Sequence, residues 1–146
     1  MTIKCIINKS NHNPIVLPKD LSEKINDENF VSSSEFFTID SDMSGYSISI
    51  GRKYTVMGLI FFHDELCYLI SDDNNIPGFF PSDLFEIIES YILFDWEINS
   101  FQIGSRQLVV IGYTELAQNY AHLIGLIDCK EKEIQTYLNM RGKQTE

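Results

Sequence analysis

The sequence lacks basic residues over a long internal segment, because no Lys or Arg occurs between Tyr54 and Ser105. This segment contains nine acidic residues, whereas the segments on either side of it are close to neutral. The whole chain of 146 residues has 11 Lys and Arg against 21 Asp and Glu, a formal net charge of −10. Nucleic acids and anionic membranes attract clustered Lys and Arg, so this balance argues against both as main partners and favours a basic protein or simple solubility.

Cysteine is scarce and long hydrophobic runs are missing. The three cysteines, Cys5, Cys67 and Cys129, are widely spaced and form no CxxC pair, which argues against a disulfide framework and a structural zinc site. The longest apolar run, residues 56–62, is far shorter than the ~20 residues that cross a membrane. The N-terminus has no apolar stretch typical of a signal peptide. These absences predict a cytoplasmic protein with reduced thiols.

Motifs for catalysis and metal binding are absent or incomplete. Residues 40–45 match the opening of a calcium-binding loop, but Gly51 occupies the twelfth position, where a bidentate Glu is needed, so we predict a hairpin turn. His63, Asp64 and Glu65 are consecutive, and their side chains therefore point in different directions. No Gly-rich phosphate loop and no nucleophile elbow is present. We predict no catalytic residue, no metal site, no cofactor and no enzyme activity.

What the sequence does contain is a series of short strand patterns followed by helical ones. Apolar and polar residues alternate over 46–50, and both faces are apolar over 54–62, which is typical of a central or curled strand. Further strands are predicted over 2–8, 35–40, 66–71 and 85–88, with a short helix over 21–26 and a helical turn over 81–84.

The period of the pattern changes near residue 114. Apolar residues then recur at helical spacing, and 130–141 is predicted to be an amphipathic helix that ends at Gly142. We therefore predict one α+β domain over residues 1–146. Its strongly bent antiparallel sheet or small barrel has C-terminal helices, about 114–141, packed on one side.

Residues 78–88, with the sequence Gly-Phe-Phe-Pro-Ser-Asp-Leu-Phe-Glu-Ile-Ile, resemble the end of a Src-homology-three domain. In that family an aromatic-Pro-Ser turn precedes a 3₁₀ turn and a last short strand. The resemblance implies a small barrel-like sheet in this part of the chain.

Hydrophobic and turn signatures also occur over Lys53–Ile60, Tyr68–Asp73, Pro81–Glu86 and Gly125–Asp128, together with Trp96. In these features the chain resembles small bacterial immunity proteins, the cytoplasmic antidotes encoded beside polymorphic or contact-dependent toxins. Members of such families bind one cognate toxin domain, often a nuclease. The resemblance implies that this protein binds and neutralises a basic toxin encoded alongside it.

The acidic segment also contains 11 of the 18 aromatic residues. A patch of one sign steers a partner of the opposite sign, and binding centres favour aromatic side chains. The predicted partner-binding residues are Asp64, Glu65, Asp72, Asp73, Phe79, Phe80, Asp83, Glu86, Asp95 and Trp96. Three alternatives remain open: an acidic surface that only increases solubility, a small enzyme or ligand-binding domain whose site is assembled from distant residues, and an adaptor that recruits peptides at a sheet edge.

Overall fold

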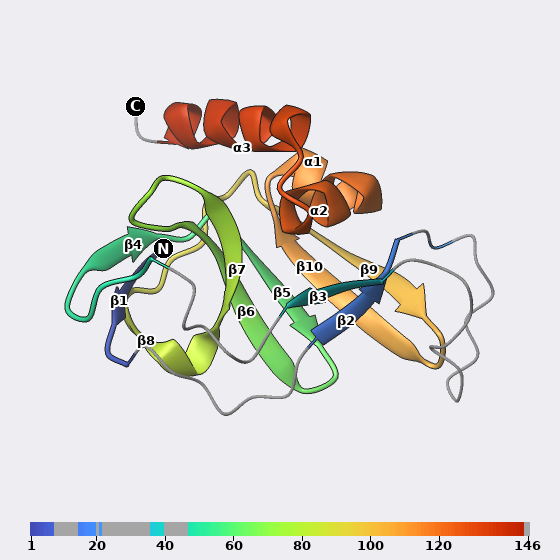
Figure 1. Cartoon of the computed structure of the whole chain (residues 1–146), viewed down its shortest axis with the longest axis horizontal. Coiled ribbons are helices and arrows are strands. Elements are labelled where there is room, and N and C mark those ends of the chain that lie inside the picture. Colours follow the sequence, from blue (N-terminus) through green and yellow to red (C-terminus); the bar gives the residue numbers. More distant parts are fainter. Residues whose placement is uncertain (8–14, 20, 22–35, 40–46, 145–146) are drawn as a thin grey trace.

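The fold is α+β, with two main antiparallel sheets and three helices at the C-terminal end (Figure 1). The computed structural model describes residues 1–7, 15–19, 21, 36–39 and 47–144. The strands form a strongly bent arrangement that does not close into a barrel, and the helices pack on one side of it. The predicted fold class is therefore confirmed, in its bent-sheet form.

The larger sheet has five strands, each antiparallel to its neighbours. In spatial order they are β7 (Pro77–Pro81), β6 (Glu65–Ser71), β5 (Gly58–Phe62), β10 (Arg106–Gly112) and β9 (Glu97–Ile103). The smaller sheet consists of β4 (Lys53–Thr55), β1 (Thr2–Cys5) and β8 (Phe85–Glu89). A separate pair is formed by β2 (Ile15–Pro18) and β3 (Phe36–Ile39).

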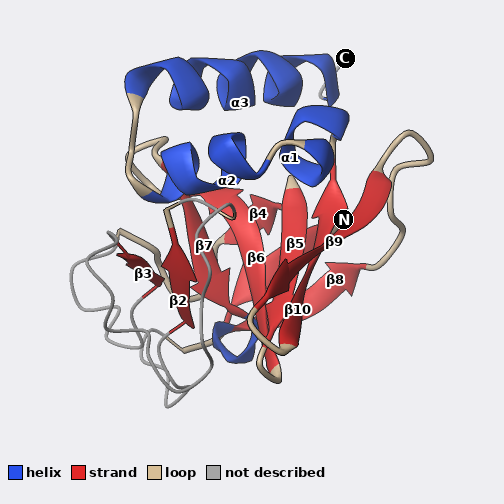
Figure 2. Ribbon diagram, turned by 90° about the vertical axis from the view of Figure 1, so that its right-hand side faces the viewer, coloured by secondary structure: helices blue, strands red, loops and turns tan. Residues whose placement is uncertain are grey.

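The helices lie together above one end of the sheets (Figures 1 and 2). They are α1 (Thr114–Gln118), α2 (Tyr120–Ile127) and α3 (Glu131–Gln144), and a single 3₁₀ turn, η1 (Ser82–Leu84), precedes β8. The expected 3₁₀ turn and amphipathic C-terminal helix are confirmed. Helix α3 nevertheless continues through Gly142 to Gln144, because this glycine does not adopt the positive φ of a helix C-cap.

The prediction of one continuous strand over 54–62 is wrong, because the chain passes there from the small sheet to the large one. The Val56 N–H donates to the carbonyl of Met1 beside β1, at 3.0 Å. The next residue, Met57, donates to the carbonyl of Leu69 in β6, at 2.8 Å. Both side chains are buried, so their apolar character reflects a buried crossing and not the interior of one strand.

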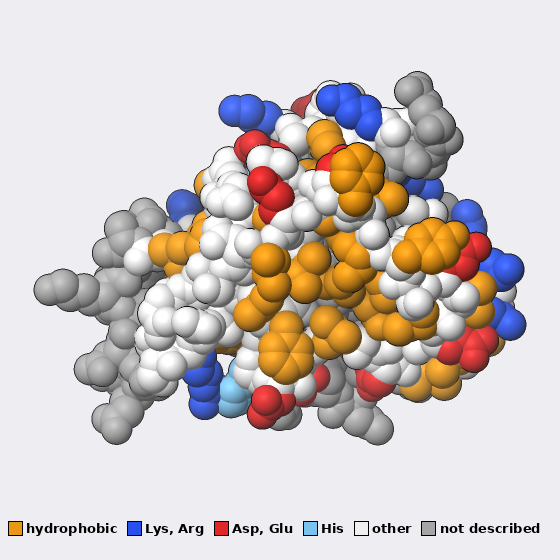
Figure 3. All heavy atoms as spheres, turned by 180° about the vertical axis from the view of Figure 1, so that it is seen from behind, with side chains coloured by type: hydrophobic (Ala, Val, Ile, Leu, Met, Phe, Trp, Pro, Cys, Tyr) orange, Lys and Arg blue, Asp and Glu red, His pale blue; other side chains and the backbone are white. Residues whose placement is uncertain are grey.

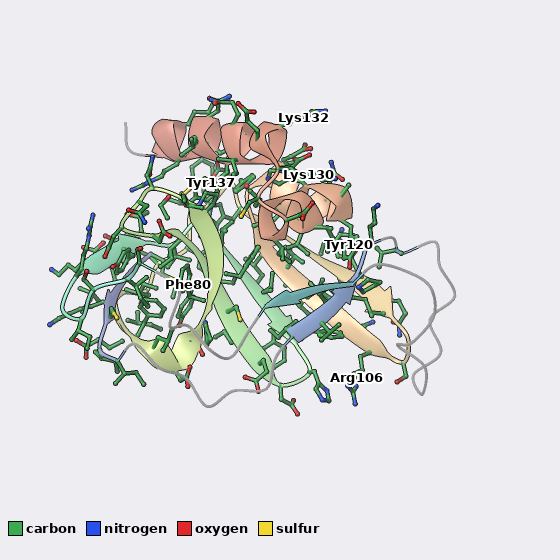
Figure 4. All side chains as sticks on the ribbon, in the orientation of Figure 1. Phe80, Arg106, Tyr120, Lys130, Lys132 and Tyr137 are labelled. Carbon is green, nitrogen blue, oxygen red and sulfur yellow. The ribbon has the colours of Figure 1, made fainter. Side chains whose placement is uncertain are left out.

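Two hydrophobic cores follow from this arrangement. The first lies between the large sheet and the layer formed by the helices and β2, and the second lies between the large and small sheets. Strand β7 contributes to both, because Phe79 belongs to the first core and Phe80, which is labelled in Figure 4, belongs to the second. The Tyr120 hydroxyl donates to the carbonyl of Pro18 and joins α2 to β2.

Three further predictions concern a short strand, a turn and a short helix in the first 50 residues. The strand expected over 46–50 is absent from its described part, residues 47–50. The calcium-like turn at 40–45 and most of the helix expected over 21–26 lie outside the described residues. Strands β5 and β6 form a hairpin whose tip residues His63 and Asp64 both have positive φ, as a two-residue I′ turn requires. None of the helices in the described ranges has the length and hydrophobicity of a membrane-crossing segment.

Candidate partner-binding surface

Two of the predicted contact residues are buried. Phe79 and Phe80 are 4% and 0% exposed, respectively, so their predicted place on a binding surface is wrong. The physical reason is that β7 lies between two cores and needs an apolar side chain on each face. Neither residue can contact a partner without unfolding of this strand.

Asp73, another predicted contact residue, is occupied by hydrogen bonds within the chain. Its carboxylate accepts from Ser49 Oγ at 2.6 Å and from the Tyr54 hydroxyl at 2.7 Å, and it pairs with Arg52 at 3.0 Å. The hydrogen bonds from Ser49 and Tyr54 lower the pKa of Asp73 below its ordinary value. Burial raises the pKa of Tyr54 to about 12, so its hydroxyl remains a donor at neutral pH. Asp73 therefore joins the β6–β7 turn to the chain before β4.

Asp72 has a similar role inside the turn. Its Oδ1 accepts from the backbone N–H groups of Asn74 at 2.8 Å and Ile76 at 3.0 Å. Such a bond pattern fixes a turn, which is a common use of Asp. Asp72 and Asp73 thus stabilise local structure, although the sequence pattern suggested a partner-binding role.

We expect Asp73→Asn to lower the free energy of unfolding by about 1–2 kcal/mol at neutral pH, because hydrogen bonds to a charged group are lost or weakened. The folded-state pKa lies below the ordinary value of 3.8. The stabilisation is therefore complete above the unfolded-state pKa and is lost as the pH falls through the lower, folded-state pKa. Urea denaturation from about pH 7 down to about pH 2 should show the difference between variant and wild type shrinking over that range.

Asp64→Asn is the matched control for this prediction. Asp64 is exposed at the β5–β6 tip with a φ of 64°, a conformation that Asn also tolerates. It should unfold like the wild type at neutral pH. An equal loss in both variants would contradict a structural role for the Asp73 carboxylate.

The remaining predicted residues lie at or near the surface. Asp83, Glu86 and Asp95 are exposed, and Glu65 is half-buried. Trp96 is also half-buried and packs against the second core, and its buried Nε1–H has no hydrogen-bond partner among the described residues. The structure therefore brings acids to the surface but does not surround them with the aromatic residues that were predicted.

A different set of apolar side chains is exposed, and it was not predicted from the sequence. Its members come from one strand of the large sheet and from the stretch that runs from β8 into β9. We call it the apolar face, and it consists of Phe61, Ile87, Tyr91, Ile92, Phe94 and Ile98. Ile88 is also exposed, but it is adjacent to Ile87 on β8 and therefore points to the other side of that strand. Phe94 is fully exposed, Tyr91 is 68% exposed and Ile98 is 67% exposed.

Strand register places part of the apolar face on one side of the large sheet. Ile98 of β9 lies opposite Ile111 of β10, and Val109 of β10 lies opposite Phe61 of β5. Val109 and Ile111 are half-buried, so they continue the apolar surface between the two outer side chains. These residues alternate with Leu108 and Val110, which belong to the first core.

The apolar face lies on the side of the sheet opposite to β2 and β3. Figure 2 shows β2 and β3 on one side and the connection from β8 to β9 on the other. From that second side, hydrophobic side chains gather over the middle of the molecule (Figure 3). Isolated exposed apolar residues are ordinary, whereas a gathered patch marks an interaction site.

Acidic residues border the apolar face. Glu86 and Glu89 belong to β8, Asp95 lies in the connection, and Asp64 occupies the hairpin tip after Phe61. Glu97 points to the other side of β9 from Ile98 and accepts a hydrogen bond from Gln118 of α1 at 3.5 Å, so it does not belong to this border. We call Asp64, Glu86, Glu89 and Asp95 the acidic rim. Glu86 lies 3.9 Å from Lys4, in an exposed pair that contributes little stability. The segment that carries both the face and the rim contains no Lys or Arg.

A polar pocket of about 140 Å³ lies elsewhere, between the turn before β4, the β6–β7 turn and α3. Arg52, Asp73 and Arg141 contribute to its lining. Each of these side chains already bonds within the chain, and Arg141 donates to Ser71 Oγ and to Asn75 Oδ1. In the described ranges, no three His, Cys, Asp or Glu side chains are grouped to hold a metal ion.

A buried polar chain connects α1, α2 and α3. The Tyr113 hydroxyl lies 2.6 Å from His122 Nε2, and His122 Nδ1 bonds to Glu133. Tyr113 and His122 are 2% and 0% exposed, and burial raises the pKa of the Tyr113 phenol. Tyr113 and His122 are thus shielded from solvent, whereas the Glu133 side chain is partly exposed, and the hydrogen bonds of the chain link the helices. Sequence spacing alone gave no signal for it, because the three residues lie in different helices or at their ends.

No protein-family model, curated protein or solved structure was found to match the chain.

Proposed function

We propose that this protein is an immunity-type inhibitor that binds one basic toxin domain through its apolar face and acidic rim. The observation that carries the proposal is the coincidence of the two features within one segment without Lys or Arg. Protein interfaces have an apolar centre with aromatic residues and a polar border. The apolar face would form the apolar centre, and the acidic rim would form the polar border.

In the proposed mechanism, this protein acts by covering a surface of the toxin and not by a chemical reaction. The acidic rim would attract a positively charged toxin surface and increase the association rate, by about 10- to 1,000-fold at low salt. The apolar face would then exclude water and slow dissociation. A toxin that binds an anionic substrate has such a positively charged surface, so the inhibitor would cover the substrate-binding region.

The partner's charge follows from the rim. Two copies of this chain meeting through their apolar faces would bring eight carboxylates of the rim near one another, and like charges across an interface oppose association. Anionic lipid surfaces are disfavoured for the same reason. A partner rich in Lys and Arg is the one that gains from this arrangement.

The test is co-expression with the product of the adjacent reading frame. Expression of that product alone should arrest growth, and this protein should restore growth and co-purify with it. Binding should weaken strongly as the salt concentration rises, because the rim charges are screened. Growth arrest that this protein does not relieve, without a complex between the purified proteins, would refute the proposal.

A further inference from the structure

The most exposed part of the apolar face is a tight turn between β8 and β9. The Trp96 N–H donates to the Leu93 carbonyl at 3.1 Å, which places Phe94 and Asp95 at the two central positions of a four-residue turn. The Phe94 side chain is 101% exposed, the highest value among the exposed large hydrophobic residues of the described chain. An apolar ring thus projects from the surface with an acidic neighbour.

The base of this turn is fixed to the body of the protein. Trp96 packs against the second core on the β9 side. On the β8 side, Glu89 accepts hydrogen bonds from the Tyr91 hydroxyl at 3.2 Å and from Thr2 Oγ1 of β1 at 3.5 Å. A ring presented from an ordered turn loses little conformational entropy on binding, so more of its burial contributes to affinity.

We propose that Phe94 is the anchor residue that inserts into an apolar pocket of the partner. This inference rests on the proposed function, in which the partner is a protein. The partner should have an apolar pocket whose entrance is lined by Lys or Arg, since Asp95 is adjacent to Phe94 and Glu89 lies close to it along the chain. Buried aromatic anchors of this kind contribute a large share of binding free energy.

The test is calorimetric titration of the purified product of the adjacent reading frame with wild type and Phe94→Ala. We expect the variant to bind at least about 30-fold more weakly, with an unchanged melting temperature because the side chain contacts solvent. Ile76→Ala is the matched control. Ile76 is 45% exposed in the β6–β7 turn, where the adjacent Asn75 contacts α3, and its truncation should change affinity by less than about threefold.

Three other results would overturn the inference. Binding of Phe94→Ala within about threefold of wild type would overturn it while leaving the proposed function intact. No binding by the wild type would overturn both. The third result would come from the protein alone. A dimer in sedimentation that Phe94→Ala abolishes would assign Phe94 to contact with a second copy. Flotation with phosphatidylcholine vesicles that Phe94→Ala abolishes would assign it to a membrane.

Discussion

His122→Ala should lower the free energy of unfolding by about 3 kcal/mol, the largest stability change that we expect from one substitution in this protein. The imidazole is completely buried between the Tyr113 hydroxyl and the Glu133 carboxylate. Its removal leaves a cavity and deprives a buried hydroxyl of its partner, and both effects destabilise the folded state. Urea denaturation measures the change directly.

Two further variants separate the polar chain from a general effect of substitution. Gly125→Ala should also destabilise the protein, because the new Cβ would lie 2.2 Å from Glu133 Cγ and would displace the side chain that bonds to His122. Gln135→Ala, on an exposed part of α3, should change stability by less than about 0.5 kcal/mol. A His122→Ala protein that unfolds at the same urea concentration as Gln135→Ala would contradict the role assigned to the chain.

Phe61→Lys combined with Ile98→Lys should weaken partner binding by more than about 1,000-fold. The two positions belong to the part of the apolar face that lies on the large sheet, and Ile111 and Val109 lie between them. Each new ammonium group would be desolvated against a basic partner, which combines a desolvation cost with like-charge repulsion. The fold should remain intact, because both native side chains are 45% or more exposed.

The matched control adds the same two charges to the helices. Ala121→Lys with Gln135→Lys places them at exposed positions on α2 and α3, away from the apolar face. Calorimetry should give an affinity within about fivefold of wild type for this pair. Equal weakening by both double variants would show that net charge, and not the apolar face, determines binding.

Much of the fold could be predicted from local patterns. Hydrophobic alternation and turn residues indicated β6, β8 and η1 correctly, because these elements follow strand period and turn chemistry. The crossing at Val56 and Met57 could not be predicted, since a buried crossing and a central strand have the same apolar composition. Strands β9 and β10 were also missed, although Leu108, Val110 and Gly112 alternate with less buried residues.

The binding surface was predicted less well than the fold. An Asp in a turn can face a partner or can hold the turn, and sequence alone did not show that Asp72 and Asp73 do the latter. The sequence also did not show which aromatic residues are buried: Phe79 and Phe80 are core residues, whereas Phe94 is exposed. Burial depends on which sheets pack against each strand, and this packing is a property of the tertiary structure.

The central claim is that the apolar face with its acidic rim is the surface that binds the partner. Hydrogen exchange of this protein, measured alone and in complex with the product of the adjacent reading frame, tests it most directly. If the partner binds at this surface, exchange should become slower on binding in residues 85–103 and in the β5–β6 hairpin and stay unchanged in α2 and α3. Slower exchange confined to the helices, with no change in residues 85–103, would contradict it.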